Sequence, residues 1–199
     1  MILIFGPAGS GKSLQGEKLA KKHGWQWLSV GKLLRERQSP EIEEQLKGGE
    51  LFEDEFVARM MNEAIEKAEG DGGQVILDGY PRSLWQAEWI VKNGYINRIK
   101  GAIVLEVPED ELMKRLMIRG RSDDLEETIK RRWEVYEQNI CSIISLLKSK
   151  NVKIEKIDGL GSIEKVASKI EDAVSEWNLI EEIDAESEKE KEEEKSYGE

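Results

Sequence analysis

The sequence contains almost no cysteine and no long apolar run. Among its 199 residues Cys141 is the only cysteine, so the chain holds neither a disulfide framework nor a four-cysteine zinc site. No apolar run approaches the length that spans a membrane, and the apolar start, residues 1–5, has no basic flank before it. We therefore expect no membrane association, and we expect a cytoplasmic protein.

Net positive charge is lacking too, because the formal net charge is −11 at pH 7. Residues 181–199 hold ten acidic residues against Lys189, Lys191 and Lys195, a net charge of −7, which leaves −4 for the rest of the chain. Bulk charge of this sign argues against non-specific nucleic-acid binding, so we expect no nucleic-acid partner. Residues 181–199 are also too polar to offset the entropy of ordering, and we expect an acidic disordered tail there.

The sequence does have a glycine-rich loop near its start. Residues 6–13, Gly-Pro-Ala-Gly-Ser-Gly-Lys-Ser, match the pattern GxxxxGK[ST]. An apolar run that predicts a strand precedes the loop and a helical pattern follows it, which is the context that this motif requires. Backbone N–H groups of such a loop can hold a polyphosphate, while Lys12 adds a positive charge and Ser13 a hydroxyl for Mg²⁺. The alternative, a turn that binds nothing, leaves Lys12 unexplained.

Apolar runs and helical patterns alternate along the rest of the chain. Strands are expected over residues 1–5, 25–29, 74–78, 101–107 and 152–157, and helices over 14–23, 32–37, 40–47, 54–69, 84–93, 109–119, 125–150 and 162–177. We place Leu14 with Leu19 on one helical face, and Ser39 and Ser162 as helix caps. The alternation predicts an α/β fold in three layers, a parallel sheet with helices on both faces. Asp78 then ends a buried strand at the edge where ligands bind.

Three further stretches resemble the adenylate kinases in order and spacing. They are residues 29–35 (Ser-Val-Gly-Lys-Leu-Leu-Arg), residues 78–82 (Asp-Gly-Tyr-Pro-Arg) with Gln86, and Arg115, Arg119, Arg121 and Arg132 around Asp123 and Asp124. The resemblance extends over the chain to about Trp177, and residues 121–132 are especially similar to the short-lid members of that family.

The resemblance implies how the domain is divided. It gives a P-loop core of residues 1–29 and 57–180, and a small helical insertion of residues 30–56 that binds a nucleoside monophosphate. It also gives a vestigial lid loop of residues 119–124. Only Gly120 separates Arg119 from Arg121, so neither a separate lid domain nor a zinc knuckle fits there. We therefore expect a minimal lid and no zinc.

The chemistry of phosphoryl transfer agrees with the resemblance. A phosphate monoester is already an anionic nucleophile, so the protein needs no catalytic base and must hold two polyanions in line. Arginine suits this task because its guanidinium stays charged and binds phosphate oxygens bidentately. The alternative is that these arginines are solvated helix charges paired with glutamates, as Arg37, Arg59, Arg98 and Arg131 can be.

The resemblance implies a role for each motif residue. The catalytic residues are Lys12, Arg82, Arg119, Arg121 and Arg132. The donor ATP is expected at Gly6, Pro7, Ala8, Gly9, Ser10, Gly11, Lys12, Ser13, Leu14, Arg115 and Arg119. The acceptor AMP is expected at Val30, Arg35, Leu51, Val57, Gly79, Arg82, Gln86, Arg121 and Arg132. Mg²⁺ is expected to bind with ATP at Ser13 and, through water, at Asp78, although Asp78 could instead cap a turn at Gly79.

The choice of base depends on fewer residues. A glutamine at the position of Gln86 recognises adenine in this family, because its amide can donate and accept along the N6 and N1 edge. An ordinary helix glutamine is the alternative. Val30 replaces the usual threonine, Lys32 stands where an acidic residue is usual, and Leu14 lacks the hydroxyl found at its position.

The sequence thus predicts an adenylate kinase that transfers a phosphoryl group reversibly from MgATP to AMP, with ATP, AMP and ADP as small-molecule partners. A monomer or a small homo-oligomer is expected. Two alternatives stay open: a UMP/CMP kinase, and a P-loop regulatory protein that binds nucleotide with weak turnover.

Overall fold

The computed structural model describes residues 1–37, 39–49, 51–70, 73–121 and 124–177. The predicted acidic tail, residues 181–199, lies outside the described residues. So do Ser122 and Asp123 of the predicted lid loop. The boundaries predicted for the core, the insertion and the lid loop stay predictions.

A five-stranded parallel sheet forms the centre of the molecule. The strands are β1 (Ile2–Phe5), β2 (Gln26–Ser29), β3 (Val75–Asp78), β4 (Gly101–Glu106) and β5 (Lys153–Asp158), in the order β2-β3-β1-β4-β5. Every residue of β1 and β3 is buried, whereas the edge strands β2 and β5 are partly exposed. Unbroken apolar runs suit β1 and β3 because helices cover both faces of the sheet there. The predicted α/β fold is confirmed.

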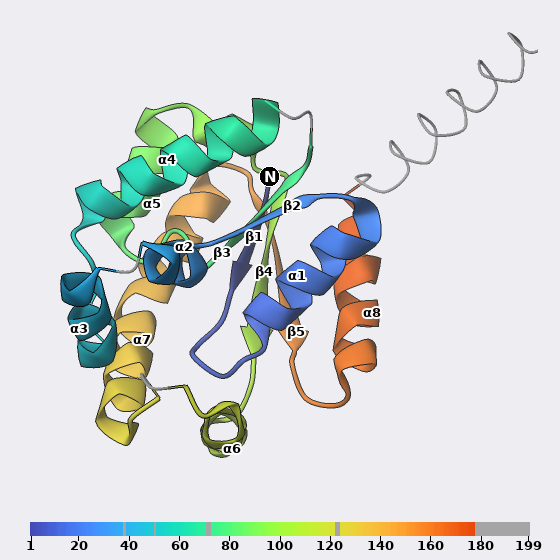
Figure 1. Ribbon diagram of the computed structural model, residues 1–199. Helices are drawn as coiled ribbons and strands as arrows, with labels where there is room; N and C mark the ends of the chain where they lie inside the picture. Colours follow the sequence, from blue (N-terminus) through green and yellow to red (C-terminus); the bar gives the residue numbers. More distant parts are fainter. Residues whose placement is uncertain (38, 50, 71–72, 122–123, 178–199) are drawn as a thin grey trace, which may run out of the picture.

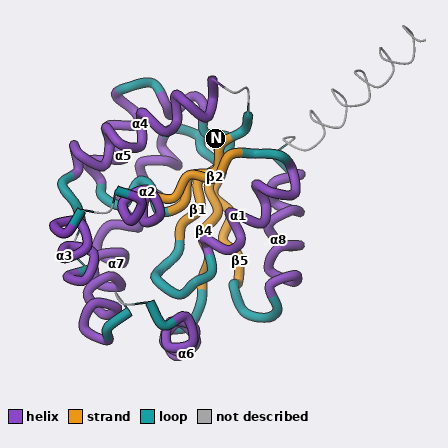
Figure 2. Tube along the Cα trace, in the orientation of Figure 1, coloured by secondary structure: helices purple, strands orange, loops and turns teal. Residues whose placement is uncertain are grey.

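The two faces of the sheet carry different helices (Figure 1). Helices α1 (Lys12–His23) and α8 (Ile163–Ser175) pack on one face, where Ile2 and Ile4 of β1 point. Helices α2 (Val30–Glu36), α4 (Asp54–Gly70), α5 (Leu84–Lys92) and α7 (Glu126–Ser149) cover the other face, with Leu3 and Phe5. Successive strand side chains point to opposite faces, so one short strand supplies both cores. Figure 2 shows the strands between these two helical layers.

Several predicted details differ from the structure. Leu14 is 48% exposed, because α1 buries the face that carries Gln15 and Leu19 instead. Ser162 caps α8 as predicted and accepts from the Lys165 N–H, but the Ser39 hydroxyl donates to the Glu41 carboxylate rather than capping its helix. A short 3₁₀ helix, η1 (Tyr95–Arg98), was not predicted.

The remaining helices lie beside one end of the sheet. Helix α6 (Glu109–Arg119) has the predicted bounds, and α3 (Pro40–Gly48) lies near α7 in Figure 1. None of the nine residues of α3 is fully buried. Gly49 ends α3 in the left-handed conformation, with φ +75°.

Candidate functional site

A cleft opens at the carboxyl ends of the central strands. Strand β1 lies between β3 and β4, where the connections run to opposite faces of the sheet, and such positions commonly bind ligands. The cleft is lined by residues from the loop after β1, from the end of β3, from α2 and α3, and from α7. Among the predicted site residues, those that line it are Gly6, Pro7, Ala8, Lys12, Ser13, Arg35, Leu51, Asp78, Gly79, Arg82, Arg119, Arg121 and Arg132.

The glycine-rich loop is held from outside by α6 and α7. The indole N–H of Trp133 donates to the Ala8 carbonyl at 3.0 Å, and a guanidinium nitrogen of Arg115 lies 3.5 Å from the Ser10 carbonyl. A Cβ at Gly9 would lie 2.8 Å from the Leu112 carbonyl oxygen, so only glycine lets α6 approach this closely. Packing against α6 and α7 therefore fixes the loop without the help of a ligand.

Lys12 opens α1 and extends back along the loop. Its ammonium donates to the Pro7 carbonyl at 3.2 Å. Burial lowers the pKa of Lys12 from its ordinary value of 10.5 to about 8; Asp78 opposes that shift, and Arg82, Arg119 and Arg132 add to it. These charges come from three separate segments of the chain, and all act on one ammonium group.

Arg82 lies on the opposite wall, after β3. Its Nε donates to the Gly79 carbonyl at 2.8 Å. Burial lowers the pKa of Arg82, with Arg132 and Arg35 adding to that shift and Asp78 opposing it. The exposed Arg35 side chain folds over Gly31, where a Cβ would lie 3.3 Å from a guanidinium nitrogen. Arg35 and Arg82 therefore face the same side of the cleft.

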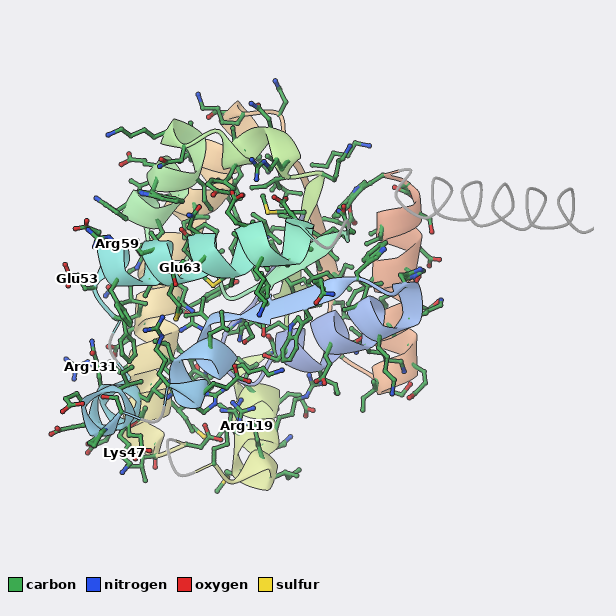
Figure 3. The ribbon with its side chains drawn as sticks, turned by 45° about the horizontal axis from the view of Figure 1, so that its top comes forward. Lys47, Glu53, Arg59, Glu63, Arg119 and Arg131 are labelled. Atoms are coloured by element: carbon green, nitrogen blue, oxygen red, sulfur yellow. The ribbon has the colours of Figure 1, made fainter. Side chains whose placement is uncertain are left out.

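Asp124 gathers the arginines of the lid loop and α7. Its side chain is 2% exposed and accepts two hydrogen bonds from Arg119, one of them from Nε at 2.8 Å. A guanidinium nitrogen of Arg132 lies 3.6 Å from the same carboxylate, and the Arg121 N–H donates to it at 3.3 Å. Figure 3 shows that Arg119 and Arg131 lie well apart. Of these two arginines, Arg119 lines the cleft and Arg131 does not.

Asp78 is the best candidate anchor for a metal-bound nucleotide. It is 1% exposed, and neither carboxylate oxygen has a hydrogen-bond partner among the described residues. The alternative that it caps a turn is not supported, because the Gly79 N–H donates to the Ile4 carbonyl at 3.3 Å. An unpartnered buried carboxylate beside Lys12 and Ser13 fits a hydrated Mg²⁺ that arrives with a polyphosphate. In the described part of the chain no group of three or more His, Cys, Asp or Glu could hold a metal alone.

Several predicted site residues do not line the cleft. Val30 and Val57 lie in the hydrophobic core at 1% and 2% exposure. Gln86 is buried, with its amide oxygen accepting from the Arg82 N–H and its amide nitrogen donating to Asp54. Arg115 bonds Glu111 and the Gly159 carbonyl. Gly9, Ser10, Gly11 and Leu14 are also absent from the lining.

Lys32, which stands where the resemblance leads us to expect an acidic residue, is absent from the cleft lining. Its ammonium stands 5.3 Å from the centre of a Trp27 ring and 3.9 Å from the Glu36 carboxylate. The Lys32 ammonium therefore makes its described contacts outside the cleft lining.

The sequence reasoning missed the wall that α7 contributes. This wall consists of Val135, Tyr136, Asn139, Ile140 and Ile143. These positions follow Arg132 at helical spacing, so projecting α7 from Arg132 would have found them. Leu46 and Gly49, at the end of α3, were missed as well.

Comparison with known proteins gives one consistent family. The model of the adenylate kinase family matches residues 4–152. An adenylate kinase from Thermus thermophilus is 35% identical over 185 residues, covering 87% of this chain and 96% of that protein. Adenylate kinases from Bacteroides thetaiotaomicron and Synechococcus sp. (strain WH7803) are 38% and 33% identical, covering 87% and 85% of this chain and 97% and 96% of those proteins.

Proposed function

The chain belongs to the adenylate kinase family and is a nucleoside monophosphate kinase, and from that premise we propose how its cleft holds ATP, AMP and Mg²⁺. The observation that carries the proposal is the convergence of Arg82, Arg119, Arg132 and the buried Asp78 on Lys12. Such a cluster of cations is costly in an empty protein and favourable once phosphates enter.

The reaction needs positioning and charge neutralisation rather than proton abstraction. The glycine-rich loop and Lys12 hold the β- and γ-phosphates of ATP, and Lys12 neutralises charge as the phosphoryl group moves. Arg35 and Arg82 hold the AMP phosphate from the opposite wall. Arg119, Arg121 and Arg132 surround the group in transit, so the acceptor oxygen, the phosphorus and the leaving oxygen can lie in line.

Mg²⁺ would be held by Ser13 and, through water, by Asp78. When bound with ATP it supplies Lewis-acid neutralisation of the donor phosphates. The chain's own part is to keep the Asp78 carboxylate buried and free of competing donors among the described residues.

AMP is the proposed acceptor because of Gln86, although that amide is engaged by Asp54 and by the Arg82 N–H. The Arg82 contact places the amide next to the arginine proposed to bind the AMP phosphate. We propose that adenine meets the remaining amide donor and acceptor capacity of Gln86.

A cytoplasmic location and a monomeric or small homo-oligomeric state belong to this proposal as well. In the described part of the chain, no helix is both long and apolar enough to cross a bilayer.

An acceptor screen tests the assignment. AMP, CMP, UMP and GMP are each offered with MgATP to the wild type, to Lys12→Ala and to Lys18→Ala, a matched exposed lysine of α1. We expect AMP to turn over fastest in the wild type and in Lys18→Ala, and kcat to fall by about 100- to 1,000-fold in Lys12→Ala. Faster turnover of a pyrimidine monophosphate would favour a UMP/CMP kinase. Tight ATP binding without AMP-dependent ADP formation would favour a regulatory protein.

A further inference from the structure

The end of α3 meets the first turns of α7 at a small polar junction. The Thr128 hydroxyl donates to the Lys47 carbonyl at 2.5 Å, and a guanidinium nitrogen of Arg132 donates to the Leu46 carbonyl at 2.8 Å. Carbonyls in the last turn of a helix have no partner further along that helix. The Gly49 N–H also donates to the Leu46 carbonyl, at 3.3 Å, so Arg132 adds a second donor there, and Thr128 supplies the donor to the Lys47 carbonyl.

Gly49 fits closely against the same threonine. A Cβ on Gly49 would lie 2.9 Å from the Thr128 carbonyl oxygen and 3.0 Å from its methyl carbon. The neighbouring Gly48, by contrast, has no described residue within 4 Å of an added Cβ. Thr128 is 5% exposed, so the junction is closed to water on this side.

The junction matters because α3 has few apolar contacts. None of its residues is fully buried, and among them Ile42 and Leu46 pack against the hydrophobic core. A helix with so little apolar burial is easily displaced, so the two polar contacts to α7 contribute much of what keeps it in place.

The junction also borders the cleft. Leu46 and Gly49 line it together with Arg132, and Arg132 reaches both Asp124 and the Leu46 carbonyl. The end of α3 thus covers the cleft where the arginines of α6 and α7 converge.

We propose that Thr128 is a positioning residue for the phosphoryl transfer. It fixes the end of α3 against α7, so that the insertion encloses the acceptor side of the cleft without a separate lid domain. The proposal rests on the proposed function in one respect, that the side of the cleft next to α3 receives AMP.

The Thr128 hydroxyl group is the part of the side chain that we expect to hold α3. Replacing Thr128 by valine keeps the shape of the side chain but removes the donor, which leaves the Lys47 carbonyl without that bond. We expect the arrangement in which α3 is bonded to α7 to be less populated and the KM for AMP to rise roughly three- to tenfold. The KM for ATP should change less than about twofold, because the hydrogen bonds described for the donor loop come from Lys12, Arg115 and Trp133 rather than from Thr128 or α3.

The test uses the full-length enzyme and four variants: Thr128→Val, Thr128→Ser, Gly49→Ala and Gly48→Ala. Amide hydrogen exchange of residues 40–49 is measured without nucleotide, and KM and kcat are measured for each substrate. We expect faster exchange over residues 40–49 and a higher KM for AMP in Thr128→Val and Gly49→Ala. Thr128→Ser, which keeps the donor, and Gly48→Ala, which meets no described neighbour, should behave like the wild type.

The two measurements separate this proposal from the proposed function. Unchanged amide exchange over residues 40–49 in Thr128→Val would contradict the proposal that Thr128 holds α3 against α7, whatever the activity of the variant. Equal rises in KM for AMP and ATP would overturn its assignment to the acceptor side. If the wild type shows no AMP-dependent turnover, the proposed function is contradicted. If Thr128→Val nevertheless exchanges faster than the wild type over residues 40–49, the junction between α3 and α7 is still supported.

Discussion

The glycine-rich loop, proposed to hold the donor, and the insertion, proposed to hold the acceptor, are built in opposite ways. The loop continues a fully buried strand, and Trp133, Arg115 and a close approach of α6 hold it. Helix α3 of the insertion buries no residue completely and depends on two hydrogen bonds to α7. The donor side is thus preorganised by core packing, whereas the acceptor side depends on a few polar contacts that can break and re-form. We expect movement during the catalytic cycle to concentrate in the insertion.

The largest effect should come from removing Lys12, which anchors the rigid side. Lys12→Ala removes the only lysine among the described residues that line the cleft, and we expect kcat to fall by about 100- to 1,000-fold. The melting temperature should stay equal or rise, because the variant no longer carries a desolvated charge near three arginines. A coupled ADP assay and thermal unfolding measure the two quantities. A parallel loss of fold and activity would contradict the view that the loop is shaped by packing.

The pH dependence of ATP binding should be the next largest effect. Lys12 loses its proton near pH 8 in the folded chain but near its ordinary pKa of 10.5 in the unfolded chain. The unfolded state therefore holds more protons between these values, so the contribution of Lys12 to stability rises from about pH 8 to 10.5. ATP favours the charged amine, so affinity for ATP should fall over the same range.

Calorimetry in two buffers of different ionisation enthalpy checks this linkage. We expect proton uptake on ATP binding at about pH 8.5, where free Lys12 is largely neutral. Lys12→Ala should show no such uptake from this group. Equal uptake in the variant would assign the proton to another residue.

A smaller effect should follow from loosening the donor loop. Trp133→Phe keeps the aromatic packing but removes the N–H that bonds the Ala8 carbonyl, and we expect the KM for ATP to rise roughly threefold. The KM for AMP should stay near the wild-type value, which is the reverse of the pattern expected for Thr128→Val. Steady-state kinetics with each substrate varied in turn would show whether the two sides separate in this way.

The smallest effect is expected from deleting residues 180–199. Their composition predicts no packing against the core, so catalysis and melting temperature should stay close to the full-length values. A drop in melting temperature of several degrees would show that this segment packs on the domain.

Local patterns were enough to predict the sheet, most helix bounds and the loop that begins at Gly6. The resemblance to the adenylate kinases implied Arg82, Arg119 and Arg132, which the structure brings together around Lys12. The glycine-rich motif predicts the position of the loop because its strand, loop and helix are contiguous in sequence.

Contacts between distant segments could not be predicted in the same way. The amide of Gln86 is held by Asp54, 32 residues away, and the Thr128 hydroxyl by Lys47, 81 residues away. Neither residue belongs to a local pattern that indicates its partner. The position of Leu14 was predicted wrongly because an apolar residue in a first helical turn can face either the core or the solvent.

Helix α7 contacts both proposed nucleotide sides of the cleft through residues that are close in sequence. Thr128 holds α3 and Trp133 holds the donor loop, five positions apart and therefore separated by about 7.5 Å along the helix axis. The distance between the two proposed substrate positions therefore depends on the rise per residue of one helix. Inserting a single residue between those positions would turn one anchor by about 100° relative to the other. The register of α7 is therefore a constraint on catalysis that no individual side chain reveals.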